Sequence, residues 1–442
     1  MRTPRSLRPT PAWFSHARWV VVVLALIAVA VGAFFVFRER PKHAVATLIV
    51  PPLRGLAIGL DEENASLLGT GGPAAFAPWR DRLAAIEPSF VRLDVVWSKL
   101  QPQAAAAPDW NAEQSGCVRD VPPCAPYPGL RGQLHALAEQ QRAHAGRFIG
   151  YVVLFGAPPW ATAPPHGCVA PGAGPTALSL SADGRAAYRR FVLGVLQVAR
   201  EQGADLRYWS AWNEPNQPAF LSPQRERCDV NARAVSPGEY ALLVRQLRAA
   251  LDETPGDQQL VLGETAAYDT PRPTATSTVE FADGLPHDVV CASDIWAQHA
   301  YVGTEGAGPV ADLAGDPGRA GSMGLLDQLE RALDRRGCSE RKRNWITETG
   351  VGGPKPGGPR PTDPAALRAQ CRALNAALRE WYRAPRVDAA FQYTFREDNT
   401  YPVGLVNTGL TQVYPTYDLL RAWGERSFPT DGPPPLPPDC RG

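Results

Sequence analysis

Two glutamates each end a short apolar run and lead into a loop. Glu214 ends the segment 208–214 (YWSAWNE) and is followed by proline, which disfavours helix at the residue before it. Glu348 ends the segment 344–348 (NWITE) and leads into Thr-Gly. Two carboxyl groups that flank one C–O bond can cleave it, because one protonates the leaving oxygen while the other attacks the carbon or activates water. Such a pair requires a scaffold that brings the two segments together.

The segments around these glutamates belong to a repeating pattern of buried strands and amphipathic helices. Short, continuous apolar runs are typical of parallel strands that are covered on both faces. We count eight: 56–60, 90–96, 148–155, 206–212, 260–263, 295–300, 345–347 and 389–394. The alternation predicts an α/β fold, a (β/α)8 TIM barrel over residues 53–428. The long loops follow the second, third, fourth and sixth runs, on the face where barrel active sites lie.

Helical periodicity predicts the elements between the strands. The expected helices are 76–86, 130–144, 184–202, 238–251, 325–335, 365–382 and 416–423, with a weaker one at 279–285. Two starts carry capping signals. Ser236-Pro237-Gly238-Glu239 fits a capping box with proline at the first helical position, and Asp363-Pro364 fits a cap followed by proline.

The two ends of the chain differ from the barrel region. Residues 1–18 are basic and contain no acidic residue, and residues 19–37 are an unbroken apolar run long enough to cross a bilayer. We expect a cytoplasmic N-terminus, a transmembrane anchor at 19–37 and a linker at 38–52; a cleaved signal peptide is the alternative. Either reading places the barrel outside the cytoplasm. Residues 429–442 form a Pro-rich C-terminal tail.

Charge and cysteine content restrict the partners. The net charge of +1 gives no indication of a nucleic-acid partner. All eight cysteines follow the apolar run, which in an oxidising compartment predicts up to four disulfides. Cys117–Cys124 is the expected short-range pair. No CxxC motif occurs, and His166-Gly167-Cys168 lacks a second ligand pair, so we expect no metal site.

The ordered set of strand-end motifs resembles the clan A glycoside hydrolases, and most of all family 39, the β-xylosidase and exopolysaccharide endoglycosidase branch. Besides the two glutamate segments, four others match: 91–97 (VRLDVVW), 157–161 (APPWA), 299–301 (HAY) and 391–398 (FQYTFRED). The resemblance covers about residues 53–425. It departs at the eighth strand, where Phe395 and Arg396 occupy the region of a tryptophan that is common in the clan.

The resemblance implies roles for individual residues. Glu348 would be the nucleophile and Glu214 the acid/base, with one carboxyl ionised and the other protonated at the start of the reaction. The other implied substrate-binding residues are Arg92, Asn213, His299, Tyr301, Trp97 and Trp160. Arg92 would also contact the nucleophile, and the two tryptophans could equally be packing residues. Glu264 and Asp398 are rival carboxylates at the same face.

The sequence therefore predicts a retaining O-glycosyl hydrolase that acts on an extracytoplasmic poly- or oligosaccharide. No cofactor is required, since two carboxyl groups suffice. Two alternatives remain open: a transglycosylase that uses the same glutamate pair, and a non-catalytic glycan-binding barrel.

Overall fold

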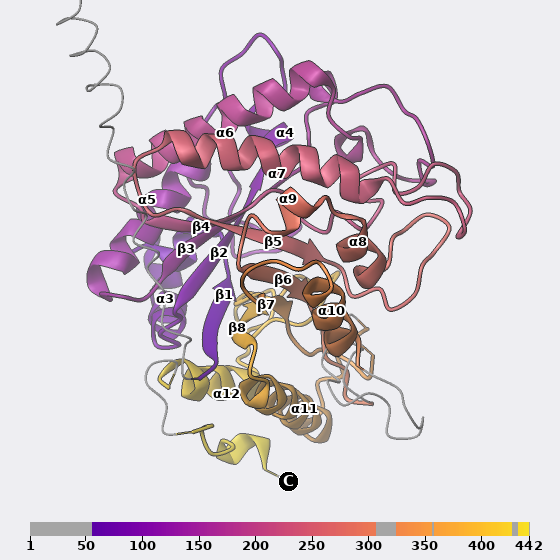
Figure 1. The fold of residues 1–442 in the computed structure, drawn as a ribbon. Coiled ribbons are helices and arrows are strands. Elements are labelled where there is room, and N and C mark those ends of the chain that lie inside the picture. Colours follow the sequence, from indigo (N-terminus) through magenta and orange to yellow (C-terminus); the bar gives the residue numbers. More distant parts are fainter. Residues whose placement is uncertain (1–54, 306–323, 356–357, 427–431, 442) are drawn as a thin grey trace, which may run out of the picture. The chain divides into compact units, whose positions relative to one another are not determined.

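The computed structural model describes residues 55–305, 324–355, 358–426 and 432–441, all within the compact unit Leu53–Gly442. Eight parallel strands close into a barrel in sequence order (Figure 1). The strands are β1 (Ala57–Asp61), β2 (Phe90–Val96), β3 (Ile149–Phe155), β4 (Leu206–Ser210), β5 (Gln259–Thr265), β6 (Ile295–His299), β7 (Arg343–Thr349) and β8 (Val387–Tyr393). This confirms the predicted TIM barrel, with every predicted run forming a strand.

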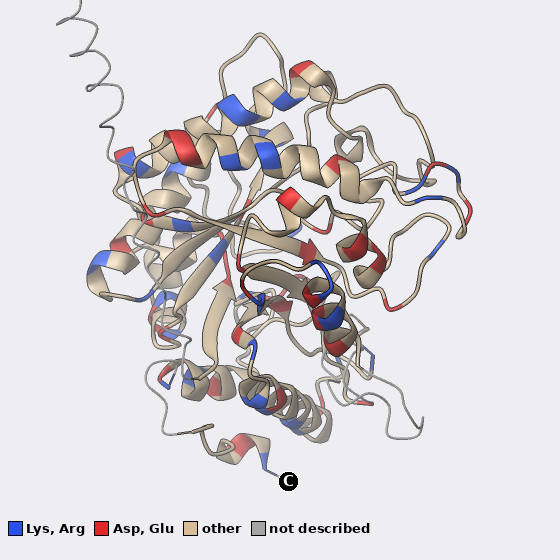
Figure 2. Ribbon diagram, viewed as in Figure 1, with Lys and Arg blue, Asp and Glu red and all other residues tan. Residues whose placement is uncertain are grey.

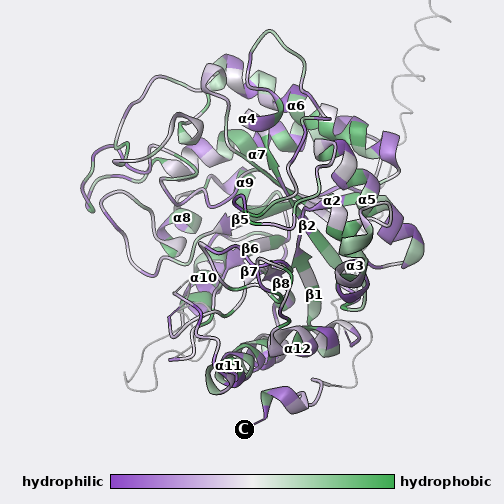
Figure 3. Cartoon of the chain, turned by 180° about the vertical axis from the view of Figure 1, so that it is seen from behind, coloured by the Kyte–Doolittle hydropathy of each residue, from purple (hydrophilic) through white to green (hydrophobic). Residues whose placement is uncertain are grey.

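Helices cover the outside of the barrel. The longer ones are α3 (Ala77–Ala84), α5 (Gly129–Ala143), α6 (Ala182–Gln202), α7 (Ser236–Glu253), α10 (Leu325–Asp334), α11 (Pro364–Arg383) and α12 (Pro415–Gly424). The weaker prediction at 279–285 is confirmed as α8 (Thr278–Gly284), and α9 (His287–Val290) follows it. Acidic and basic residues are interspersed along these helices, while the strands are largely hydrophobic (Figures 2 and 3). The short elements α2 (Ala65–Leu68) and α4 (Trp97–Leu100) lie in the loops after β1 and β2.

The capping predictions had different outcomes. At α11, Asp363 Oδ1 accepts hydrogen bonds from the amides of Ala365 and Ala366, so this cap is confirmed. At α7 the capping box is wrong: Val235 precedes the helix, and Ser236 is already its first residue. The Ser236 hydroxyl is buried and instead lies 3.1 Å from the Thr276 hydroxyl. The hydroxyl of Ser236 thus contacts a residue distant in sequence instead of capping the helix.

An apolar plug fills the interior of the barrel toward the end at which the strands begin. It is formed by inward-facing rings from four strands, Phe90, Tyr208, Trp345 and Phe391, and Tyr151 packs against Trp345 and Phe391. Phe391 lies 5.7 Å from Phe90 and 5.8 Å from Trp345, measured between ring centroids. Gly59 leaves room for this packing, because a Cβ there would lie 2.2 Å from the Phe391 ring. The plug makes this end of the barrel a packed core rather than a pore.

All eight cysteines form disulfides. Cys117–Cys124 is confirmed, and Cys168–Cys228 joins the loops after β3 and β4. Cys291–Cys338 and Cys371–Cys440 complete the set, the last joining the C-terminal tail to α11. The expected anchor at 19–37 lies outside the described residues. Among the residues that are described, none of the helices has both the length and the apolar content to span a bilayer.

Candidate active site

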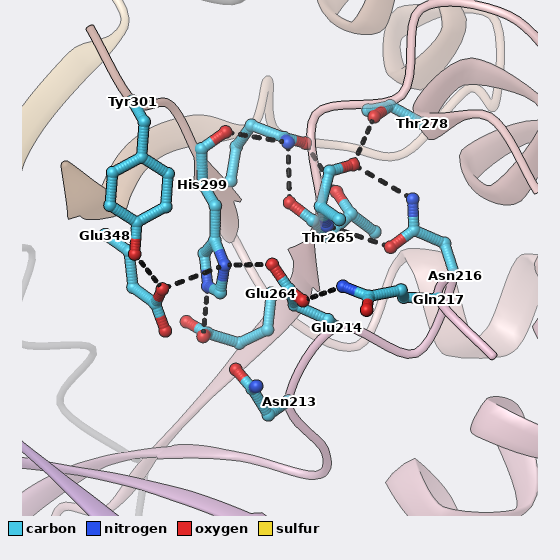
Figure 4. Close-up of polar contacts among 12 residues, drawn as sticks. Asn213, Glu214, Asn216, Gln217, Glu264, Thr265, Thr278, His299, Tyr301 and Glu348 are labelled. Atoms are coloured by element: carbon cyan, nitrogen blue, oxygen red, sulfur yellow. Dashed lines mark hydrogen bonds and ion pairs between the residues drawn. The ribbon is translucent and has the colours of Figure 1, made fainter. Parts of the chain in front are cut away.

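Glu214 follows β4 in a backbone conformation that is uncommon for a residue with a side chain. Its φ is +38°, and its amide donates to the Glu264 carbonyl at 2.9 Å. His299 Nδ1 lies 2.8 Å from Glu214 Oε1, and Gln217 Nε2 donates to Oε2. Such backbone conformations cluster at functional sites, where surrounding contacts maintain them. These contacts hold the Glu214 carboxylate between His299 and Gln217 (Figure 4).

Glu348 lies near the end of β7 and is 7% exposed. Arg92 Nη2 lies 2.9 Å from Glu348 Oε1, and the Tyr301 hydroxyl donates to Oε2. His299 Nδ1 lies 3.4 Å from the same Oε2. Arg92 and Tyr301 thus both stabilise negative charge on Glu348, and the Arg92 contact is the one that the resemblance implied. This is the environment that an ionised nucleophile requires.

The two glutamates face each other across a short gap. Ligand-type atoms of Glu214, His299 and Glu348 all lie within 4.8 Å of one another, and Figure 4 shows the three side chains converging. The same grouping could in principle hold a cation. However, both imidazole nitrogens already face carboxylate oxygens, at 2.8 Å to Glu214 and 3.0 Å to Glu264. His299 therefore contacts carboxylates through both ring nitrogens.

Arg92 is the centre of the charged layer above the plug. Its guanidinium is fully buried and contacts Asp61 at 2.5 Å, Asp94 at 2.9 Å and Glu264 at 3.0 Å, in addition to Glu348. It also donates to Asn213 Oδ1 at 2.8 Å. Asn213 is thereby oriented by a side chain of the site and lies beside Glu214 in Figure 4. A single arginine holds carboxylates from four strands in one layer.

Glu264 occupies a central place that the sequence analysis did not assign to it. It is fully buried, and it accepts hydrogen bonds from Arg92, His299 and the Tyr151 hydroxyl. Burial alone would raise the pKa of Glu264, but Arg92 and His299 outweigh burial and lower it to about 2. The signal in the sequence was its position, since Gly263-Glu264 ends a strand as the other site residues do. Gly263 at φ +93° and Glu264 at φ +53° turn the carboxylate inward.

His299 is held between three carboxylates. Burial would lower its pKa, but Glu348 and the hydrogen bonds to Glu214 and Glu264 raise it well above the usual value. Nε2 therefore donates to Glu264, whose pKa is lowered, while Nδ1 lies 2.8 Å from Glu214 Oε1. The pKa of Asp94 is shifted in the opposite direction from that of Glu264, because burial raises it to about 6 despite the nearby Arg92.

The two tryptophans named from the sequence lie apart from this group. Trp97 is 1% exposed, donates to Gln101 Oε1 and packs on Trp160, Tyr188 and Phe191. Trp160 is partly buried and donates to the Gln101 carbonyl at 3.1 Å. Among the contacts of the described residues, neither ring touches Glu214 or Glu348. For Trp97 the geometry favours the packing alternative, since no ring face is open to a sugar.

Comparisons with known proteins identify solved structures with a similar fold. No protein-family model and no curated protein sequence matches the chain. Solved structures that match include SrfJ from Salmonella typhimurium, with a TM-score of 0.55, 10% identity and coverage of 86% of this chain and 76% of that one. A conserved exported protein from Bacteroides fragilis matches with a TM-score of 0.51 and 15% identity over 80% of this chain and 72% of that one.

A family 39 glycoside hydrolase from Bacteroides cellulosilyticus WH2 also matches, with a TM-score of 0.48 and 14% identity over 86% of this chain. The chain covers 65% of that enzyme's length. The structural neighbours of this chain thus include family 39 and other clan A glycoside hydrolases, the group that its motifs resemble, and at these identities the likeness is one of fold.

Proposed function

We propose that the protein is a retaining glycoside hydrolase in which Glu348 is the nucleophile and Glu214 the acid/base. The observation that carries the proposal is the short gap between the two carboxylates, which lie within 4.8 Å of each other at one pair of oxygens. Retaining enzymes have carboxyl groups about 5–5.5 Å apart, whereas inverting enzymes need about 6.5–9.5 Å to admit a water. The spacing favours direct attack by one of the carboxylates.

The neighbours of each carboxylate support this division of roles. Glu348, held by Arg92 and Tyr301, would attack the anomeric carbon and form a glycosyl-enzyme. Glu214 would protonate the departing oxygen and then take a proton from the incoming water. His299 fixes the Glu214 carboxylate, and Gln217 holds its other oxygen. No step requires a metal or an organic cofactor.

The proposed substrate is a β-linked poly- or oligosaccharide outside the cytoplasm. Four disulfides support an oxidising compartment, where such bonds persist. A tethered enzyme suits an exopolysaccharide or cell-envelope glycan better than a diffusing nutrient, and the predicted anchor at 19–37 is therefore part of this proposal. We also propose Asn213, His299 and Tyr301 as sugar contacts.

The test is digestion of a panel of β-linked glycans by the wild-type protein and by Glu348→Gln. Glu226→Gln is the matched control, because Glu226 is an exposed glutamate in the loop after β4 whose partner is Arg233. We expect wild type and control to release the same products, and Glu348→Gln to release none. Equal hydrolysis by Glu348→Gln contradicts the nucleophile assignment. Transfer to an added acceptor sugar in place of water would show a transglycosylase, and glycan binding without cleavage would show a non-catalytic barrel.

A further inference from the structure

Three tyrosines gather beside Glu348, and only one of them has an assigned task. Tyr301 donates to the carboxylate, while Tyr393 ends β8 and Tyr401 lies in the loop that follows. The ring of Tyr401 lies 4.5 Å from that of Tyr301, and Tyr393 lies 6.1 Å and 6.2 Å from the two others. We call Tyr393 and Tyr401 the tyrosine wall.

The hydroxyls of the tyrosine wall are available to a ligand. Both side chains are partly exposed, and neither hydroxyl has a hydrogen-bond partner within the described part of the chain. Burial raises the pKa of Tyr401, and the negative charges of Glu348 and Glu214 raise it further. For Tyr393, burial is followed by Glu348 and Asp61 as the causes of a raised pKa. Both residues are therefore neutral donors, and their rings pack beside Tyr301, which itself donates to Glu348.

A disulfide-closed hairpin holds the loop that carries Tyr401. The hairpin comprises residues 116–125 and is closed by Cys117–Cys124. Its Arg119 Nε donates to both carboxylate oxygens of Asp398, at 2.8 and 3.0 Å. Asp398 in turn accepts from the Thr400 amide, and its carbonyl accepts from the Tyr401 amide at 3.0 Å. Arg119 thus fixes the turn whose last residue is Tyr401.

A second arginine links the hairpin to the loop after β8. Arg396, in the segment after β8, is 3% exposed. It donates to the carbonyls of Gly116, Val121 and Pro123 in the hairpin. The hairpin after β2 and the loop after β8 therefore form one unit, although 280 positions of sequence separate Gly116 from Arg396.

We propose that the tyrosine wall is the binding platform for the sugar ring on the nucleophile side of the scissile bond, and that the disulfide hairpin positions Tyr401 through Arg119. This rests on the proposed hydrolase function and specifies its glycone site. A sugar ring offers an apolar C–H face, which packs on an aromatic ring, and hydroxyls that accept from phenols. The wall supplies both kinds of group beside Tyr301, whose hydroxyl donates to Glu348.

The experiment measures kcat and KM on the best substrate of the glycan panel for Tyr401→Ala, Tyr401→Phe and Arg119→Ala. Arg245→Ala is the matched control, because Arg245 also makes two hydrogen bonds to one aspartate, Asp288, in an exposed pair between α7 and α9. We expect Tyr401→Ala to raise KM about tenfold through loss of ring contact. Tyr401→Phe should raise it roughly two- to tenfold through loss of one hydrogen bond, and less than Tyr401→Ala.

Arg119→Ala should raise KM in the same direction as Tyr401→Phe, with the melting temperature close to that of Arg245→Ala. A KM for Tyr401→Ala equal to that of wild type overturns the platform. A normal KM for Arg119→Ala overturns the role of the hairpin. If the wild type hydrolyses nothing in the panel, glycan binding to the same variants decides: binding that Tyr401→Ala abolishes supports the platform although the hydrolase proposal has failed, and no binding by the wild type overturns both.

Discussion

The two ends of the barrel interior are built from the same strands, but one end is lined by apolar residues and the other by charged residues. Along β2 the inward side chains are Phe90, Arg92 and Asp94, so one step of two residues takes the chain from the apolar plug to the charged layer. The plug is held by ring packing, which depends little on pH. The charged layer is held by Arg92 and His299 against a larger number of carboxylates. The first region maintains the barrel, and the second is available for chemistry.

The largest expected effect lies in the charged layer. Glu214→Ala should reduce kcat/KM by roughly 10²- to 10⁴-fold, because a positioned acid/base contributes about that much. Azide should restore turnover and yield a glycosyl azide of retained configuration, since a small anion can replace the water that Glu214 would activate. Thermal unfolding serves as the control, with little change expected. A folded Glu214→Ala variant that keeps full activity, or one whose lost activity azide does not restore, contradicts the acid/base role.

In the plug, Phe391→Ala should cost stability and leave chemistry intact. Removing this ring deletes contacts with Phe90, Tyr151 and Trp345, and such buried truncations cost about 3–5 kcal/mol. Denaturant unfolding at pH 5 and pH 8 measures the loss, which should be the same at both. A loss that varies strongly with pH would show that the plug is coupled to the charges above it.

Glu264→Gln should produce the pH-dependent counterpart. The folded-state pKa of Glu264 is about 2, below the value of about 4.3 expected when unfolded, so its stabilisation is present above that unfolded value and is lost as pH falls toward 2. The difference in unfolding free energy between wild type and variant should be roughly 3 kcal/mol at pH 7. It should shrink below pH 4. A difference that stays constant from pH 7 to pH 3 contradicts the electrostatic account.

The smallest expected effect is that of Trp97→Phe, which distinguishes a packing role for this residue from stacking on a sugar. Trp97→Phe should lower the unfolding free energy by about 1–2 kcal/mol, through lost contacts with Trp160 and Phe191. KM should not change, because the ring is buried. A raised KM with unchanged stability would restore Trp97 to the binding site.

Much of the fold could be predicted from the sequence because the barrel has a strong pattern. Strand 90–96 was predicted with the bounds that the structure shows, and each strand-end glutamate was found from its local segment. Glu264 was underestimated because its importance comes from Arg92, Tyr151 and His299, which lie on other strands. The cap at Ser236 failed for the same reason, since Thr276 is a distant partner. The tyrosine wall depends on a hairpin contact across the barrel mouth that no local pattern encodes.

The central claim is that Glu214 and Glu348 act from opposite sides of one anomeric carbon at retaining distance. The direct measurement is proton NMR of the anomer that forms first when the wild-type protein hydrolyses a glycan identified by the panel. The account predicts that this sugar has the configuration of the bond that was broken and mutarotates only later. First appearance of the opposite anomer would contradict the claim, because it requires a water between the carboxylates instead of attack by Glu348.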